Sequence, residues 1–453
     1  MANNLLTMSY ITNEALVVLE NELVLANRVE RQYSNEYAQT GAKVGNTVNI
    51  RRPPRYIGTY GPPLNVEDSN ETYVQVALNY QFHVDVQFTT QDLALSMDMF
   101  KKRILRPQIA AVANRIDSDM AQYAYINTST TLGQFGTSPA SFKIFSDARA
   151  YLAAEACPTE GEKNCVLDPV SMSSVIDAVK GLFNPQAQLG EWNEKGLIAR
   201  QFAGLDWWED QNIPTYITGA QGGSPVLANV TGTAHLSTGW AQQGTINTTG
   251  WTASTGVIKV GDTIQFVTVA PVFPVNPQNR LQYGKIAKQF VVLPPGGFVT
   301  PPPGAASPGL TYGAATLAAG TFNPATGVYT SSAGTTLTLT IGECIISGGQ
   351  FQNVTGQPTT SSTILVNGGT AYANLTSPQG LVFHKYAFAL AFADLPLPQG
   401  VEMAVRAYDD EDVGMSIRCV TQYTINNDSE PTRADVLYGP ASLYRSLGIR
   451  IAG

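Results

Sequence analysis

Residues Thr89 to Asn127 read TTQDLALSMDMFKKRILRPQIAAVANRIDSDMAQYAYIN, and this stretch decides the fold. Its apolar residues recur every three or four positions, which is the period of one buried face of an α-helix. That apolar stripe consists of Leu105, Ile109, Val112, Ile116, Met120 and Tyr123. The polar face is predicted from the residues between them, which are Asn114, Asp117, Ser118 and Gln122. The pattern predicts a long helix that acts as a strut.

Capping residues set the limits of this strut. Thr89 or Thr90 can cap a short first helix with Asp92 completing a capping box, and Asp98 is placed to cap the long helix. A helix from Asp98 to Ile126 would be about 40 Å long. Pro107 has no amide hydrogen to donate, so it must kink the helix or lie near its true start.

The sequence before the strut predicts a long strand and a hairpin. From Val74 to Phe88, apolar and polar residues alternate without a break, which is the pattern of a half-buried strand. Fifteen residues in a strand would span about 50 Å. A second strand is predicted from Lys43 to Arg52, and the Pro- and Gly-rich loop from Pro53 to Glu71 joins the two. Strands this long predict a hairpin that projects from the body and needs a partner surface.

The first 41 residues read as an N-terminal arm. Thr12 is placed to cap a helix, and the apolar face of that helix repeats at helical spacing. Its members are Leu16, Leu19, Leu23 and Ala26. The residues that follow, up to Tyr37, are charged and weakly patterned, so the arm must pack on another part of the protein.

After the strut the pattern changes twice. Residues 142–220 alternate short apolar strands with helices, expected at Phe142–Ala156 and Ser171–Leu182, which indicates an α+β or α/β body. Residues 221–373 hold only four basic and two acidic residues, and short β runs recur between turn signals. This all-β region includes a Pro- and Gly-rich excursion, Pro294 to Gly334, that is expected to be a surface loop. The α+β style resumes in 374–453, so the β region is predicted to be inserted.

The net charge, the cysteines and the apolar runs of the chain argue against several classes of protein. The 453 residues carry a net charge of −8, and their pI is near 5.0, so a sequence-specific nucleic-acid binder is not expected. The four cysteines lack the spacing of a zinc site and are interpreted as free thiols; they are Cys157, Cys165, Cys344 and Cys419. The N-terminus lacks the features of a signal peptide, and the longest apolar run, Tyr386 to Ala393, is too short to span a bilayer.

No catalytic, cofactor or metal site is predicted. His83 lies on the polar face of the long strand, His235 lies in a loop, and His384 is expected only to form a hydrogen bond. Trp207 and Trp208 could stack on a sugar, but interior packing is the preferred interpretation. The spacing of the acidic run Asp409–Asp412 is wrong for a calcium loop, and the basic run is interpreted as a solvated helix face or a local phosphate contact. That basic run consists of Lys101, Lys102, Arg103 and Arg106.

In this order of elements the chain resembles the major capsid proteins of tailed phages, which have the HK97-like fold, and within them the podophage-type coat proteins with an inserted β domain. The resemblance is carried by stretches that span most of the sequence. They are ILRPQIAAVANRID (104–117), GLIARQFAGLDWWEDQNIPTY (196–216), IKVGDTIQF (258–266), VNPQN (275–279), IISGGQFQNVTG (345–356), GLVFHKYAFAL (380–390) and TRADVLYGPASLYRSLGIRI (432–451).

The resemblance implies a domain map with an α+β capsid subunit. Residues 1–41 would be the N-terminal arm, and 42–141 the E-loop hairpin and the peripheral domain with its spine helix. Residues 142–220 would be the first part of the axial domain, 221–373 the inserted β domain, and 374–453 the return to the axial and peripheral domains. The segment 296–334 is longer than the family pattern.

The resemblance also implies a function and partners. The subunits would form hexamers and pentamers of an icosahedral shell around double-stranded DNA, which they touch by non-specific contacts. A portal, a scaffolding protein and a decoration protein are the further partners expected, with no membrane and no cofactor. The protein would be assembled in the host cytoplasm and end in the virion. Some members join an E-loop lysine to a neighbour's asparagine, but Pro53–Glu71 contains no lysine, so no such cross-link is expected.

Three other functions are weaker interpretations. An encapsulin-type shell would share the fold but enclose protein cargo. A β-rich surface adhesin or decoration protein would leave the hairpin and the strut without a purpose. An enzyme is the weakest of the three, because no catalytic constellation is present.

Overall fold

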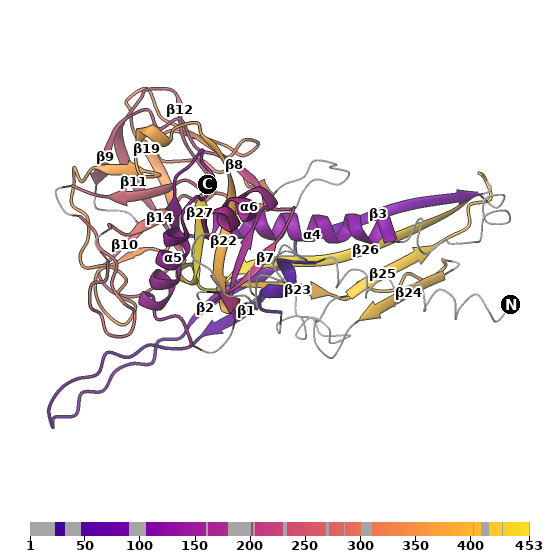
Figure 1. Ribbon diagram of the computed structural model, residues 1–453, viewed down its shortest axis with the longest axis horizontal. Coiled ribbons are helices and arrows are strands. Elements are labelled where there is room, and N and C mark those ends of the chain that lie inside the picture. Colours follow the sequence, from indigo (N-terminus) through magenta and orange to yellow (C-terminus); the bar gives the residue numbers. More distant parts are fainter. Residues whose placement is uncertain are drawn as a thin grey trace.

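The architecture comes from a computed structural model of the chain. It describes residues 23–31, 47–89, 106–159, 162–179, 201–202, 204–229, 233–268, 271–284, 286–299, 310–401, 403–408, 416–427 and 429–452. Within these ranges the protein is an α+β structure of three α-helices and many strands (Figure 1). No helix in these ranges is both long and apolar enough to cross a membrane. The predicted helix of the arm lies outside them up to residue 22, and in its described part Leu23 is not helical while Ala26 begins a short 3-10 helix. The predicted caps Thr90, Asp92 and Asp98 and the acidic run also lie outside them, whereas the alternative cap Thr89 is the last residue of a strand.

The strut is helix α4, Arg106–Ile126, which is about 32 Å long. Pro107 lies in its first turn, where a proline is tolerated. The side chains of Asn127 and Thr128 donate hydrogen bonds to the Tyr123 and Ala124 carbonyls and so satisfy the helix end. Four members of the predicted apolar stripe are buried, namely Ile109, Val112, Ile116 and Met120, whereas Tyr123 is half-buried and Leu105 lies outside the described residues. Asp117 is buried as well. The predicted polar face is therefore not solvent-exposed at Asp117, because the arm covers it.

The strut lies on a long antiparallel sheet whose centre is β26, Ser429–Ser442 (Figure 1). Strand β3 pairs along one edge of β26 from Ser429 to Tyr438, and β25 and β23 follow one another along the other edge. The remaining strands of this sheet are β3 (Tyr80–Thr89), β23 (Phe388–Ala393), β24 (Met403–Tyr408) and β25 (Ser416–Thr421).

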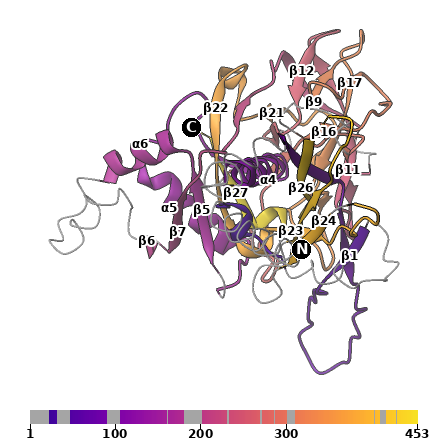
Figure 2. The ribbon, with the colours of Figure 1, turned by 90° about the vertical axis from the view of Figure 1, so that its right-hand side faces the viewer.

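A second, mixed sheet forms the middle of the molecule, and helices α5 (Phe142–Ala154) and α6 (Pro169–Val179) lie beside it (Figure 2). Phe145 of α5 packs on Trp207, with ring centroids 4.9 Å apart, so this tryptophan is interior, as expected. The sheet contains β4 (Thr130–Gly133), β5 (Lys163–Leu167), β6 (Gln201–Phe202), β7 (Leu205–Glu209), β8 (Thr215–Ile217), β22 (Thr376–His384) and β27 (Gly448–Ala452).

Among the described residues, the strands between Gly223 and Val366 pair only with one another. They form three small three-stranded sheets and two two-stranded ones. Their bounds are β9 (Gly223–Asn229), β10 (His235–Leu236), β11 (Gln243–Trp251), β12 (Gly256–Lys259), β13 (Thr263–Phe266), β14 (Gln289–Val291), β15 (Phe298–Val299), β16 (Thr311–Tyr312), β17 (Thr321–Asn323), β18 (Val328–Thr330), β19 (Leu337–Gly342), β20 (Ile345–Ile346) and β21 (Ile364–Val366). We call this part the β module.

The interpretation of Pro294–Gly334 as a surface loop was wrong for much of its described part. β17 and β18 form a hairpin that pairs with β12, and Tyr329 is buried there with its hydroxyl donating to the Leu293 carbonyl. A row of aromatic contacts then runs from this hairpin to the strut, through Phe322, Tyr312 and Phe298 to Tyr123. Short strands of two or three residues carry no readable periodicity, which is why the sequence did not indicate them.

The predicted strand from Val74 to Phe88 is interrupted. β2 (Thr72–Ala77) pairs with β1 (Thr47–Arg52), whereas β3 begins at Tyr80 and pairs with β26. The chain crosses close over Gly439 between the two strands: a Cβ on Gly439 would lie 2.1 Å from the Ala77 carbonyl oxygen. The hairpin is confirmed, but its strands are short, and it projects from the middle of the molecule (Figures 1 and 2).

Candidate interaction surfaces

The hairpin loop, residues 53–71, is the most exposed apolar surface of the described chain. Tyr60 and Leu64 are almost fully exposed, and Tyr56, Ile57 and Val66 are more than half exposed. Isolated apolar residues on a surface are ordinary, but five in one projecting loop indicate a binding surface.

The loop is nevertheless held in one shape. The Glu67 carboxylate accepts from the Ile57 and Gly58 amides at 2.7 and 2.6 Å, so it bridges the two arms of the loop. At the base, Gln350 of the β module bonds to Asn70 and to the Asp68 carbonyl. A loop that is ordered by its own contacts and by the β module loses less entropy when a partner binds.

The arm segment, residues 23–31, lies across the strut. The Asp117 carboxylate accepts from the Val24 amide at 2.7 Å and the Ala26 amide at 2.9 Å, just before the short 3-10 helix η1, Ala26–Arg28. Burial and then the nearby Asp210 charge raise the pKa of Asp117 to about 7, although the arm amides act against that shift. Further along, Arg28 lies over the Trp208 ring at 3.6 Å. The arm is therefore fixed to the body by a buried carboxylate and a cation–π contact.

The β module is joined to the body by a buried charged network. Arg450 of β27 is fully buried, donates to the Gly261 carbonyl at 2.7 Å and lies against Tyr125 of the strut and Tyr216. Asp262 accepts from the Tyr216 hydroxyl at 2.8 Å. Burial raises the pKa of Asp262, and Arg450 acts in the opposite direction. The hydrophobic core is likewise continuous between the module and the body.

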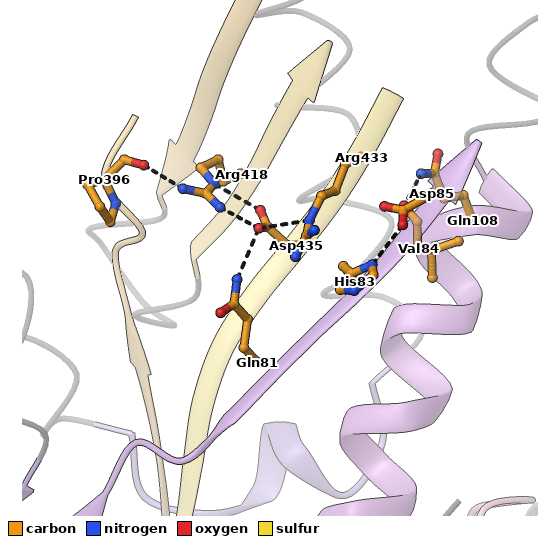
Figure 3. A network of polar contacts seen from close by, with 9 residues as sticks. All are labelled: Gln81, His83, Val84, Asp85, Gln108, Pro396, Arg418, Arg433 and Asp435. Atoms are coloured by element: carbon orange, nitrogen blue, oxygen red, sulfur yellow. Dashed lines mark hydrogen bonds and ion pairs between the residues drawn. The ribbon is translucent and has the colours of Figure 1, made fainter. Parts of the chain in front are cut away.

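The long sheet is fixed by a second polar network, drawn in Figure 3. Buried Asp435 of β26 accepts from Arg418 of β25 at 3.0 Å and from Gln81 of β3 at 3.3 Å, and it is paired with Arg433 at 3.3 Å. Gln108 of the strut donates to the Val84 carbonyl of β3 at 2.8 Å. These contacts join three strands and the strut, which makes the extended end of the subunit stiff.

The histidines singled out in the sequence do not come together. His83 is exposed and contacts Asp85 at 3.0 Å (Figure 3). His235 is half-buried, and burial lowers its pKa. His384 is buried, and its Nδ1 accepts from the Tyr386 amide, as expected. Across the described ranges no three His, Cys, Asp or Glu side chains are close enough to hold a metal ion.

The remaining candidates are the four cysteines and the two charged runs. All four cysteines are free and buried, as interpreted from the sequence. The basic residues Lys101, Lys102 and Arg103 and the acidic run Asp409–Asp412 lie outside the described ranges, and the Arg106 side chain is also not described. The surfaces found in the structure are instead the exposed loop 53–71 and the arm contact at Asp117. The sequence indicated the first by its length and composition but gave no signal for the second.

Comparison with known proteins now defines the class. The family model described as "P22 coat protein - gene protein 5" matches residues 1–278. The chain belongs to this family and is a major capsid protein of a tailed phage, which makes it a structural protein and not an enzyme. The family match does not favour the encapsulin and adhesin interpretations.

Several solved structures from phages are similar to this chain. One from Mycobacterium phage Che8 is 11% identical with a TM-score of 0.42, and the match covers 95% of this chain and 90% of that one. The capsid structure of Cyanophage P-SCSP1u is 10% identical with a TM-score of 0.42, covering 95% and 88%. The mature capsid of bacteriophage PhiM1 is 11% identical with a TM-score of 0.38, covering 90% and 82%. No match was found among curated protein sequences.

Proposed function

We propose that this capsid protein assembles as hexamers and pentamers into an icosahedral shell around a double-stranded DNA genome, and that its subunit is HK97-like. The observation that carries the proposal is the braced hairpin loop 53–71, whose apolar residues are left exposed by the described part of their own chain. A loop of this kind serves as an E-loop that lies over a neighbouring subunit. Contacts repeated around a ring bury such surfaces in every subunit at once.

The domain map fits this proposal. Residues 1–41 are assigned to the arm, 42–141 to the E-loop and the peripheral domain with its spine, 142–220 and 374–453 to the axial and peripheral body, and 221–373 to an inserted β domain. The insertion is supported by its two ends: β8 pairs with β22, and the Thr218 amide donates to the Leu375 carbonyl at 3.0 Å. Ends that lie side by side allow a domain to be inserted without disturbing its host.

Packaged DNA, a portal, a scaffolding protein and a decoration protein are proposed as partners, with assembly in the host cytoplasm and incorporation into the virion. The net charge of −8 favours local contacts with DNA over a continuous basic surface. No covalent cross-link through the hairpin loop is proposed, because this loop has Arg55 but no lysine. A ladder of multimers from boiled, reduced particles on a denaturing gel would contradict this part.

Negative-stain microscopy of purified protein, with the ratio of absorbance at 260 and 280 nm, tests the proposal. We expect uniform icosahedral shells or capsomers, and nucleic acid in particles from an infected host. A monodisperse monomer under all assembly conditions would overturn the proposed assembly. Shells that enclose protein and no nucleic acid would instead support an encapsulin-type compartment.

A further inference from the structure

A small charged cavity lies where the hairpin base, the body and the β module meet. Its volume is about 60 Å³, and it adjoins a groove of about 540 Å³ that opens along the hairpin base. Arg52, Arg55, Glu155, Pro277, Phe351 and Ser446 line both spaces, so the groove leads into the cavity. The charged residues that line the cavity are Arg52, Arg55, Glu155, Lys288, Glu343 and Arg445, and the buried Cys344 thiol lines it too.

The positive charges of this cavity exceed the negative ones. Glu155 and Glu343 both form ion pairs with buried Lys288, whose Nζ lies 3.4 and 3.5 Å from their carboxylates. The guanidinium groups of Arg52, Arg55 and Arg445 form no ion pair with any part of the chain that the structure describes. Arg52 contacts Tyr444 and Trp240 only through their rings, at 4.2 and 5.1 Å.

Two buried hydrogen-bond donors of the cavity also lack acceptors in the part of the chain that the structure describes. Arg445 is 7% exposed, and its terminal nitrogens donate to the Gln242 carbonyl and to Asn127, yet its Nε has no hydrogen-bond partner among the described residues. The Nε of Arg52 is buried as well, and no described residue accepts a hydrogen bond from it. Burial, and then the charge of Arg52, lower the pKa of Arg55. A cluster of like charges with unused donors is costly in a subunit alone and favours a bound anion.

The surroundings favour a carboxylate on a protein over a phosphate of DNA. The groove that leads to the cavity is lined largely by proline and aromatic side chains, which suit a peptide segment. The chain itself has 35 acidic against 27 basic residues, so a second copy carries carboxylates in excess. The cavity also lies at the base of the hairpin whose loop is proposed to reach a neighbouring subunit.

We propose that the cavity formed by Arg52, Arg55 and Arg445 binds a carboxylate side chain of a second copy of this chain when the shell assembles. This inference rests on the proposed function and adds a specific contact to it. The incoming carboxylate accepts hydrogen bonds from the guanidinium groups and balances their charge, while the groove holds its peptide. The contact is of the head-to-tail kind that closes subunits into rings.

Charge removal separates this role from a purely structural one. We expect Arg55→Gln to leave the melting temperature of the unassembled subunit unchanged or raised, because it relieves repulsion, while the protein concentration needed for assembly rises roughly tenfold. Arg51→Gln is the matched control, since Arg51 is the neighbouring arginine on β1, is 82% exposed and pairs with Glu71 outside the cavity. A loss of subunit stability with Arg55→Gln and no change in assembly would overturn the proposal.

Chemical cross-linking identifies the partner group. Arg55→Lys keeps the charge and introduces an amine that a carbodiimide couples to an adjacent carboxylate. Shells assembled from mixed isotope-labelled and unlabelled Arg55→Lys subunits should give mixed-isotope peptides that join position 55 to an Asp or Glu, and unassembled subunits should not. Shells that give only same-subunit peptides to Glu155 or Glu343 would overturn the proposal.

A final comparison tests for a phosphate ligand and separates the two proposals. If wild-type protein forms no shells, the proposed function itself fails. If wild-type and Arg55→Gln proteins form shells of equal stability, the function stands and this site is wrong. Inorganic phosphate or a DNA oligonucleotide that raises the melting temperature of wild-type subunits, but not that of Arg55→Gln, would overturn the carboxylate assignment in favour of a phosphate site.

Discussion

At the scale of single residues, buried charges join segments that are far apart in the sequence. Asp117 holds the arm on the strut, Arg450 holds the β module on the body, and Asp435 holds three strands together. A buried charge is tolerated only when it is paired or hydrogen-bonded. These residues therefore determine how the parts are placed, and their replacement gives sharp predictions.

Asp117→Asn should reduce the pH dependence of subunit stability. The folded-state pKa of Asp117 is raised from 3.8 to about 7, so below pH 3.8 both states are protonated and the folded state has its full relative advantage. As the pH rises toward 7, Asp117 ionises in the unfolded state before it does in the folded state. The free energy of unfolding therefore falls by up to about 1.4 kcal/mol per pH unit. Urea unfolding of dissociated wild-type subunits at pH 5 and pH 7.5 should show this loss, and Asp117→Asn should show a smaller one.

Burial also raises the pKa of Asp210, which titrates in both proteins. The difference in pH dependence between Asp117→Asn and wild type therefore isolates the contribution of Asp117. Asp147→Asn serves as the control, since that carboxylate is 44% exposed and pairs with Lys143 on the surface of α5. Equal pH slopes for Asp117→Asn and wild type would show that the arm contact is not linked to this titration.

Arg450→Met should destabilise the subunit by about 3 kcal/mol, since it leaves Asp262 buried without its counter-charge. The loss should concentrate at the junction of module and body. Hydrogen exchange should therefore quicken in β13 and β27 before it does in β24 and β25, which lie in the other sheet. Uniform faster exchange across the chain, or none, would contradict a junction role for Arg450.

At the scale of elements, the sequence predicted what repeats over many residues. The strut, α5, α6 and strands such as β13 and β19 follow from periodicity or from apolar runs. Strand β26 was missed because it contains Pro431, Gly439 and Pro440, which signal turns. β9 and β11 were missed because Gly, Thr and Asn dominate them. In each case pairing with neighbouring strands outweighs the local preference of the residues.

Gly439→Ala should disrupt the crossing between β2 and β3. The added methyl would lie 2.1 Å from the Ala77 carbonyl oxygen and 2.8 Å from its carbon, so the backbone must move. We expect a loss of roughly 2 kcal/mol of stability, measured by denaturant unfolding, and weaker amide protection in β2. Gly356→Ala is the control, because nothing lies within 4 Å of its added methyl. Equal stability of the Gly439→Ala protein and wild type would show that the crossing adapts freely.

At the scale of the whole molecule, the sequence predicted the projecting hairpin correctly but placed no interaction residues on it. A projecting element can be inferred from strand length and loop composition, because both are local properties. The arm contact at Asp117 and the arginine cavity could not be inferred, because each combines residues separated by about a hundred positions or more. Only the fold brings them together.

Tyr60→Ser combined with Leu64→Ser should separate folding from assembly in the molecule as a whole. Both side chains are exposed in the subunit, so its free energy of unfolding should change by less than about 0.5 kcal/mol. If the loop covers a neighbour, replacing each side chain removes about 1.5–3 kcal/mol of burial free energy from every contact between subunits. The concentration needed for assembly should therefore rise at least about tenfold. Light scattering during assembly, with sedimentation of the products, measures this. Thr59→Ser in the same loop is the control, and shells forming at the wild-type concentration from the double variant would show that the loop faces solvent in the particle.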